Sequence, residues 1–416
     1  MDILPVAVSL VIFIFALVAS TIYLRASLAI VFSAFLIRIV LVFIESSGYT
    51  LPGSGVDTEY FDFLGDYFRI SSITEIFVYF SFGSTLYGWM LGLLYTLTDE
   101  GRVVAQLFNA LLAALAVAYL QSTLLLKHSK RAAFLIALIF AFWPSYILFS
   151  SILLRESMIV FAVTFAFCAL VRWSTFRQPR HAVLTVGMFV LAAMLHTGMV
   201  PLIILSPLLF ILASRSHPSS IATRKATSKN TGSVAIMVGL SLLVAVIALQ
   251  SGVGLQKLSQ TEDYSSSSIM EYQQRSARNR TAYSVEASDQ SMVGLILTLP
   301  LRTIYFFTLP LPWQISEISD AAGMLDALMF VSLITVILRY KRIIGQGGYN
   351  YAPIVGFIFI AAFFSLVTSN YGTSFRHRVK LLPMLVMAVP LAVQRRRYPI
   401  GDDQLTHFRA HEKRKT

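Results

Sequence analysis

The sequence predicts an all-α protein, a polytopic transmembrane bundle of about eleven helices, with a range of about 11–13. Of its 416 residues, 56% are hydrophobic and only 13% are charged, whereas an ordinary soluble domain has about 25% charged residues. Apolar runs of about 20 residues recur along the chain, and each is long enough to cross a hydrocarbon core of about 30 Å. These runs do not alternate apolar and polar residues as the strands of a membrane barrel do, so we expect helices.

The distribution of charge favours membrane topology over a nucleic-acid partner. The formal net charge is +12, but Lys and Arg gather in short loops between apolar runs, as the positive-inside rule requires. The single cysteine, Cys168, lies within an apolar segment, which excludes an intramolecular disulfide and a cysteine metal cluster. The stretch from Met1 to Ser20 lacks the basic leading region of a secretory signal, so we expect a retained first helix.

Placing the basic loops in the cytoplasm orients every span. The expected spans are 4–24, 27–44, 103–126, 132–152, 157–172, 182–195, 198–213, 233–250, 323–338, 352–369 and 381–394. Two further apolar stretches, 83–98 and 292–311, would put basic loops on the wrong side if they crossed the bilayer. The first carries Tyr87 and Trp89, and the second carries Tyr305 and is followed closely by Trp313. Tyr and Trp prefer the headgroup level, so we expect re-entrant or surface-lying helices on the outer face. The alternative is two full spans with a local violation of the charge rule.

The expected organisation is a single transmembrane domain over 1–394, followed by a basic cytoplasmic tail over 395–416. Two large outer loops, 45–102 and 251–322, carry the interfacial helices, and 214–232 forms a cytoplasmic linker rich in Ser, Thr, Lys and Arg. We expect a multi-pass protein of the cell's inner (plasma) membrane.

Carboxylates crowd the first outer loop. Asp57, Glu59 and Tyr60 lie close together, and Asp62 and Asp66 follow. Carboxylates near one another can supply a general base or hold a divalent cation, because one pKa rises or the two groups share a metal. Asp57 is the main candidate, with Glu59 in support and Tyr60 secondary. The alternative is a solvated acidic loop.

A charged pair, Arg155 and Glu156, is expected at the outer end of a span that Pro144 should bend. Ionisable residues at that depth tend to face a cavity or a partner, although the pair can also cap a helix hairpin. His196 lies in a tight turn and is a secondary candidate for chemistry.

Arginines on the outer face form the third candidate group. Arg376 and Arg378, with His377 between them, precede the last span. The positive-inside rule disfavours arginine there, so an anionic partner explains the pair better than topology does, and guanidinium forks match phosphate oxygens. The alternative is anchoring to lipid headgroups. Further positive charge in the second outer loop comes from Arg275, Arg278, Arg280 and Arg302.

The order of these elements resembles the GT-C superfamily of membrane glycosyltransferases, which use polyprenyl-phosphate-linked sugars. The matching positions are Arg38, Asp57-x-x-Tyr60, Ser84-x-x-Tyr87, Arg102, Asn109, Pro144, Ser150-Ser151, Arg155-Glu156 and Arg376-His377-Arg378 with Pro383. The resemblance implies that Asp57 is the catalytic base or a metal ligand. The sequence departs from the family pattern where Thr58 interrupts the usual acidic pair. A weaker similarity, through Arg155-Glu156 and 310–313, is to O-antigen polymerases and ligases.

The resemblance implies a hexosyl- or pentosyltransferase of cell-envelope polysaccharide biosynthesis. It would move a sugar from a polyprenyl-phosphate-linked donor to a glycan, lipid or protein acceptor on the outer face. Asp57, supported by Glu59, would deprotonate the acceptor, and a divalent cation can bind there. The phosphate would be held by Arg376, Arg378, Arg155 and Arg302.

Two other functions stay open. One is a repeat-unit polymerase or ligase that relies on arginine and histidine. The other is a transporter or flippase for a lipid-linked glycan. Such a transporter needs charges along a path inside its spans, whereas this chain keeps charge at helix ends, with Arg38 as the main exception.

Overall fold

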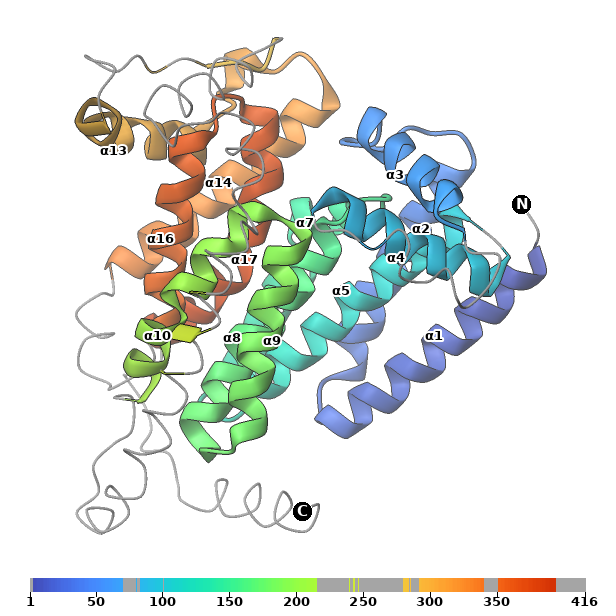
Figure 1. The fold of residues 1–416 in the computed structure, drawn as a ribbon, viewed down its shortest axis with the longest axis horizontal. Helices are drawn as coiled ribbons and strands as arrows, with labels where there is room; N and C mark the ends of the chain where they lie inside the picture. The colour runs from blue at the N-terminus through green and yellow to red at the C-terminus, as the bar shows by residue number, and fades with distance from the viewer. Residues whose placement is uncertain are drawn as a thin grey trace.

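The computed structural model describes residues 3–69, 80, 83–99, 101–214, 239, 242–243, 246, 280–283, 285, 292–339 and 351–393. Within these ranges every regular secondary-structure element is a helix. The β-bridge that is present there joins Ala282 to Asn370. The all-α fold class predicted from the sequence is therefore confirmed (Figure 1).

The described residues up to Ser214 form ten α-helices. They are α1 (Ile3–Leu24), α2 (Leu28–Ser46), α3 (Val56–Tyr67), α4 (Ser84–Thr98), α5 (Arg102–Leu124), α6 (Lys130–Ala141), α7 (Pro144–Phe149), α8 (Glu156–Phe176), α9 (Pro179–Leu195) and α10 (Val200–Ser214), with a 3₁₀ turn at Thr197–Met199. The later described helices are α13 (Met292–Thr308), α14 (Ile318–Arg339), α16 (Ala352–Val367) and α17 (Tyr371–Val393), with a 3₁₀ turn at Pro312–Gln314.

Six helical stretches of the described residues are long and apolar enough to cross a membrane. They are α1, α2, α5, α8, Thr197–Ser214 and α14. Shorter apolar helices include α9 and α16. The expected span over 233–250 lies almost entirely outside the described residues, as do most of the cytoplasmic linker over 214–232 and the whole tail over 395–416.

Helices α5 and α8 form the centre of the bundle. In the most apolar 18-residue stretch of α5, 89% of the residues are buried, whereas in that of α1 only 17% are buried. Helix α1 is therefore peripheral and presents apolar side chains outward. Buried alanines recur through α5, and small residues let neighbouring backbones approach closely. Helix α8 packs along α9, α5 and α17. The core is therefore built from the middle of the chain, with α17 closing it.

The predicted bend at Pro144 is a complete break between α6 and α7, so the expected span over 132–152 is two helices. Proline has no N–H and disrupts the preceding turn, which leaves carbonyl groups without helical partners. Arg38 of α2 fills the break. Its Nη1 donates to the carbonyl of Ala141 at 3.2 Å and its Nε to the hydroxyl of Ser150 at 2.6 Å. The arginine within a span therefore has a structural role.

Helix α17 begins ten residues before the expected span over 381–394, and this boundary of the sequence prediction was wrong. The side chain of Asn370 caps the helix, since its Oδ1 accepts from the backbone N–H of Gly372 at 2.8 Å and of Thr373 at 3.2 Å. The segment read as an outer turn is thus the first two turns of a helix. Residues four apart share one helix face, so Arg376 and Lys380 project to the same side.

One end of the bundle carries the helices of the predicted outer loops. Figure 1 shows α3 and α13 at this end, with the connection between α8 and α9 at the opposite end. Helix α13 is seen nearly end-on there (Figure 1) and contacts α16 and α17. The surface-lying placements expected for 292–311 and for 83–98, which correspond to α13 and α4, stay predictions.

Candidate active site

Arg376 is the centre of the candidate site, because its guanidinium contacts two carboxylates from distant parts of the chain. Nη1 donates to Oδ2 of Asp57, and Nη2 donates to Oε1 of Glu156 at 3.1 Å. The exposed fraction of the side chain is 26% for Arg376, 57% for Asp57 and 3% for Glu156. The structure therefore joins the acidic first loop, the Arg155-Glu156 pair and the late arginine segment in one place.

Asp57 is held there by a second cluster around Glu45, at the end of α2. The carboxylate of Glu45 pairs with Arg102 of α5 at 2.9 Å and accepts hydrogen bonds from Ser54 and Gln106. The Glu45 side chain is only 6% exposed. Because Ser54 lies in the turn that leads into α3, this cluster fixes the first turn of α3, where Asp57 is located. Sequence reasoning missed Glu45, which looks like an ordinary acid at the end of a span.

The turn before α3 also needs a glycine at position 53. Gly53 has φ of +87°, and a Cβ atom built there would lie 2.9 Å from Cε1 of Phe149. Only glycine adopts this backbone conformation without strain and leaves room for the ring. The close approach packs the turn onto the end of α7.

Behind Arg376 lies Lys380, which is fully buried. Its ammonium is 3.6 Å from Oε1 of Glu156 and 3.0 Å from Nδ1 of His377. Lys380 lies in an apolar run and belongs to no motif of the sequence. The signal that finds it is its spacing from Arg376, four residues along the same helix.

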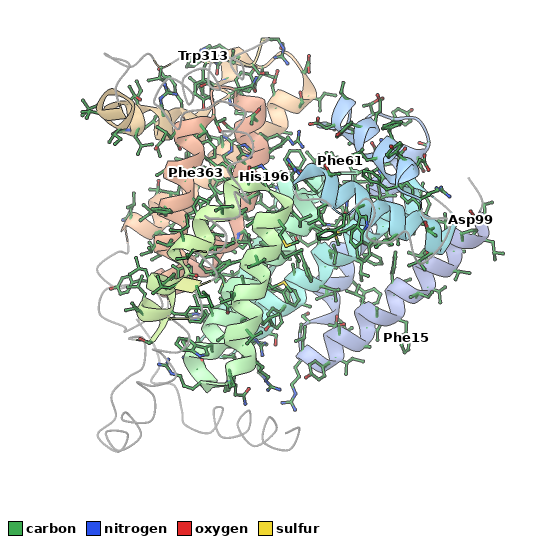
Figure 2. The ribbon with its side chains drawn as sticks, in the orientation of Figure 1. Phe15, Phe61, Asp99, His196, Trp313 and Phe363 are labelled. Carbon is green, nitrogen blue, oxygen red and sulfur yellow. The ribbon has the colours of Figure 1, made fainter. Side chains whose placement is uncertain are left out.

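The two secondary histidine candidates lie beside this charged group. The rings of His196 and His377 are 5.3 Å apart in an edge-on arrangement, and Phe364 stacks on His377 at 4.3 Å. Nδ1 of His196 accepts from the backbone N–H of Gly198 at 3.0 Å. Figure 2 shows His196 and Phe61 in the upper half of the molecule, the half that carries α3 and α13. The structure thus brings both histidines to the edge of the site.

Arg155 lies next to Glu156 and reaches two neighbouring elements. Nη1 donates to the carbonyl of Leu195 at 2.9 Å, and the guanidinium lies 5.9 Å from the ring centre of Phe61 in α3. This geometry joins the ends of α8, α9 and α3. Arg155 therefore contributes positive charge beside Arg376 and also ties α3 to the bundle.

Arg378 does not share this position, although it is only two residues from Arg376. It is 0% exposed, and Nε pairs with Asp326 of α14 at 2.9 Å. Its remaining hydrogen bonds go to the carbonyls of Phe306, Leu309 and Gly323, each at 2.9 Å. Asp326 also accepts from the indole of Trp143 at 2.7 Å. This geometry gives Arg378 a structural role in packing α17 against α13 and α14, in place of the phosphate contact expected from the sequence.

Arg302 of α13 is also buried, with 3% of its surface exposed. Its Nε donates to the hydroxyl of Thr298 at 2.9 Å, and Nη2 donates to the carbonyl of Val285 at 2.5 Å. The structure does not bring Arg302 to Arg376. Of the four arginines predicted to bind phosphate, Arg376 and Arg155 lie at the site.

Glu59 and Tyr60 project outward from α3. Glu59 is exposed, and Tyr60 is 47% exposed and contacts Phe61. Asp62 accepts from the hydroxyl of Tyr95 at 2.8 Å, and burial raises the pKa of Asp62 despite this hydrogen bond. Among the described residues, no group of three or more His, Cys, Asp or Glu side chains is arranged to hold a metal ion.

A cleft of about 170 Å³ opens beside Arg376. Its walls come from the turn before α3, the end of α7, the start of α14 and the first turns of α17, and they include Gly53, Phe149, Arg280, Asp320, Tyr371 and Arg376. Arg280 pairs with Asp320 at 2.6 Å and with Glu317 at 3.2 Å. The cleft is smaller than a typical site for a whole drug-sized ligand, which has about 300 Å³ or more, and Arg376 lies in its wall.

One family model matches the middle of the chain. Residues 95–251 match the sequence model of the family described as dolichyl-phosphate-mannose-protein mannosyltransferase. The matched stretch includes Arg155, Glu156 and His196, while Asp57 and Arg376 lie outside it. No curated protein sequence matches the chain. The resemblance to the GT-C superfamily is confirmed, and together with the apolar helices it supports a multi-pass membrane glycosyltransferase that uses a lipid-linked donor.

Proposed function

We propose that this GT-C-like membrane glycosyltransferase transfers a sugar from a polyprenyl-phosphate-linked donor to an acceptor on the outer face of the cell's inner membrane, in cell-envelope glycan assembly. The family match supports the lipid-linked donor. The outer face follows from the positive-inside orientation, in which α3 and the start of α17 lie opposite the basic loops.

The observation that carries the proposal is the contact between Asp57 and Arg376. Glycosyl transfer from a phosphate donor needs a base for the acceptor hydroxyl and a cation for the departing phosphate, at the same place. Asp57 is an exposed carboxylate on an outer helix, and Arg376 is a guanidinium at the rim of the cleft. The pair supplies both groups.

The reaction that fits this geometry is a displacement at the anomeric carbon. Asp57 takes the proton of the acceptor hydroxyl, and the acceptor oxygen forms the new bond to the sugar. The bond between the anomeric carbon and the phosphate oxygen breaks, and its electron pair stays on the phosphate. Arg376 stabilises that charge by charge-assisted hydrogen bonds, with Arg155 adding positive potential nearby.

Secondary roles follow from position. Glu59 lies two residues from Asp57 and keeps the rim of the site acidic, and Tyr60 is exposed beside it. His377 and His196 border the site on the side of Lys380.

The second candidate function is a repeat-unit polymerase or ligase. The observation that favours it is the edge-on pair of His196 and His377. His377 contacts the buried Lys380, one helical turn from Arg376. In that mechanism the arginine and a histidine would carry the chemistry, and Asp57 would be dispensable.

The test is a transfer assay with purified protein in detergent. The wild type is incubated with a panel of polyprenyl-phosphate sugars, hexosyl and pentosyl, and with glycan, lipid and peptide acceptors, and products are identified by mass spectrometry. A product that carries one added sugar supports the proposal and names the donor. A product that carries a whole repeat unit indicates the polymerase or ligase. Movement of a lipid-linked glycan across vesicles without any product indicates the transporter.

A further inference from the structure

The two carboxylates on Arg376 differ sharply in their surroundings. The side chain of Asp57 is 57% exposed, whereas that of Glu156 is 3% exposed. Asp57 is carried by α3, a helix of the outer loop, and Glu156 is the first residue of α8 in the core of the bundle. One partner of Arg376 thus faces water and the other is enclosed.

This difference decides which contact is exchangeable. An exposed ion pair is screened by water and salt and contributes little, so another anion can replace the carboxylate. A buried carboxylate that loses its partner is left without hydration, which is strongly unfavourable. A phosphate that approaches Arg376 from the cleft therefore displaces Asp57 and leaves Glu156 in place.

The geometry points to Glu156 as a positioning residue, which holds the guanidinium of Arg376 in place when the donor phosphate takes the position of Asp57. This inference rests on the proposed function. It gives Asp57 two states: in the resting protein it pairs with Arg376, and in the donor complex it is released and free to accept the proton of the acceptor.

The charges around Glu156 support the exchange. Glu156 contacts both Arg376 and Lys380, and Arg155 is its neighbour in the chain. When Asp57 leaves, the guanidiniums of Arg376 and Arg155 are left with one carboxylate between them, so an incoming phosphate restores the balance of charge. Oε2 of Glu156 is buried and has no hydrogen-bond partner among the described residues, which leaves an acceptor for a second N–H of Arg376.

The experiment measures binding of a short-chain polyprenyl monophosphate to the purified full-length protein in detergent. Glu156→Gln is expected to weaken binding about tenfold or more, since a neutral amide no longer holds the guanidinium by charge. Asp57→Asn removes the competing anion, so it is expected to bind the probe at least as tightly as the wild type. The matched control is Asp66→Asn, another exposed acid of α3, with unchanged binding expected.

Kinetics separate positioning from a general structural role. Glu156→Gln is expected to raise the KM for the donor more than it lowers kcat, and Glu156→Asp, which keeps the charge, is expected to recover part of the loss. Glu156→Gln leaves the buried ammonium of Lys380 without its carboxylate, which can destabilise the fold. The double variant Glu156→Gln/Lys380→Met removes this unpaired charge as well and tests the same role of Glu156. Its melting temperature shows whether it is folded.

Probe binding at wild-type strength in either Glu156→Gln or the folded double variant would overturn the inference, and so would weaker binding in Asp57→Asn. These outcomes leave the proposed function standing as long as the wild type transfers sugar and depends on Arg376. A wild type that forms no product with any donor would instead reject the proposed function itself.

Discussion

Arg376 donates a hydrogen bond to Asp57 across 319 residues of sequence. The contact joins α17, which closes the core, to α3, which lies in the first outer loop. It places a carboxylate beside a guanidinium that lies in the wall of the cleft, and the transfer of a sugar from a phosphate donor needs both groups. The consequences of this contact can be measured separately for each partner.

Arg376→Ala should weaken binding of a polyprenyl phosphate. A hydrogen bond to a charged group is worth about 1.5–3 kcal/mol, so the expected loss is roughly ten- to hundredfold in Kd. Arg376→Lys should recover only part of it, because an ammonium lacks the fork that matches two phosphate oxygens. Titration of each detergent-purified variant with a short-chain analogue measures its Kd. An unchanged Kd in Arg376→Ala would remove Arg376 from the phosphate site.

Arg378→Ala serves as the matched comparison, because it should lower the stability of the fold, whereas Arg376→Ala should lower the affinity for phosphate. Arg378 is 0% exposed and pairs with Asp326, and removal of one partner from a buried pair destabilises a fold by about 3–5 kcal/mol. The expected result is a large loss of thermal stability in detergent. A variant that melts like the wild type but no longer binds the analogue would restore Arg378 to the phosphate site.

Glu45→Gln should lower turnover without unfolding the protein. The carboxylate of Glu45 fixes the turn before α3 through Arg102 and Ser54, so its neutralisation loosens the helix that carries Asp57. A misplaced base slows transfer, and we expect about a tenfold lower kcat with little change in donor binding. Asp66→Asn is the control, since Asp66 is exposed on the same helix. Equal kcat in Glu45→Gln and the wild type would show that the cluster does not position Asp57.

Cysteine labelling should place the two halves of the site on the same side of the membrane. The native Cys168 is buried, so it gives little background. Val56→Cys and Thr373→Cys should react with a membrane-impermeant maleimide from the outer face, while Ser129→Cys, in a basic loop, should react only after permeabilisation. Labelling of Val56→Cys and Thr373→Cys from opposite faces would mean that the site cannot form in the membrane.

The sequence predicts the helical class, the six long apolar helices and an irregularity at Pro144, because apolar runs and proline act locally. It also identifies Asp57, Glu156 and Arg376 as separate candidates. Their meeting depends on how α3, α8 and α17 pack, which no local pattern encodes. For the same reason the sequence treats Arg376 and Arg378 alike, although a helix turns by about 200° over two residues and sends their side chains to different neighbours.

Residues that act through burial were the hardest to find. Lys380 and Glu45 are polar residues within or at the end of apolar runs, and only the packed structure shows that one lies beside Glu156 and the other beside Arg102. The start of α17 was also misplaced, because its first turns are too polar to resemble a span and depend on the Asn370 cap.

The central claim is that Asp57 is the base of a sugar transfer from a lipid phosphate, and the most direct test compares Asp57→Asn with the wild type. The substitution keeps size and removes the proton acceptor, and general-base catalysis is worth about 10²–10⁴-fold. Turnover of the donor identified for the wild type, followed by mass spectrometry, should fall by that factor while the melting temperature and donor binding are retained. Turnover near the wild-type rate in Asp57→Asn would contradict the claim.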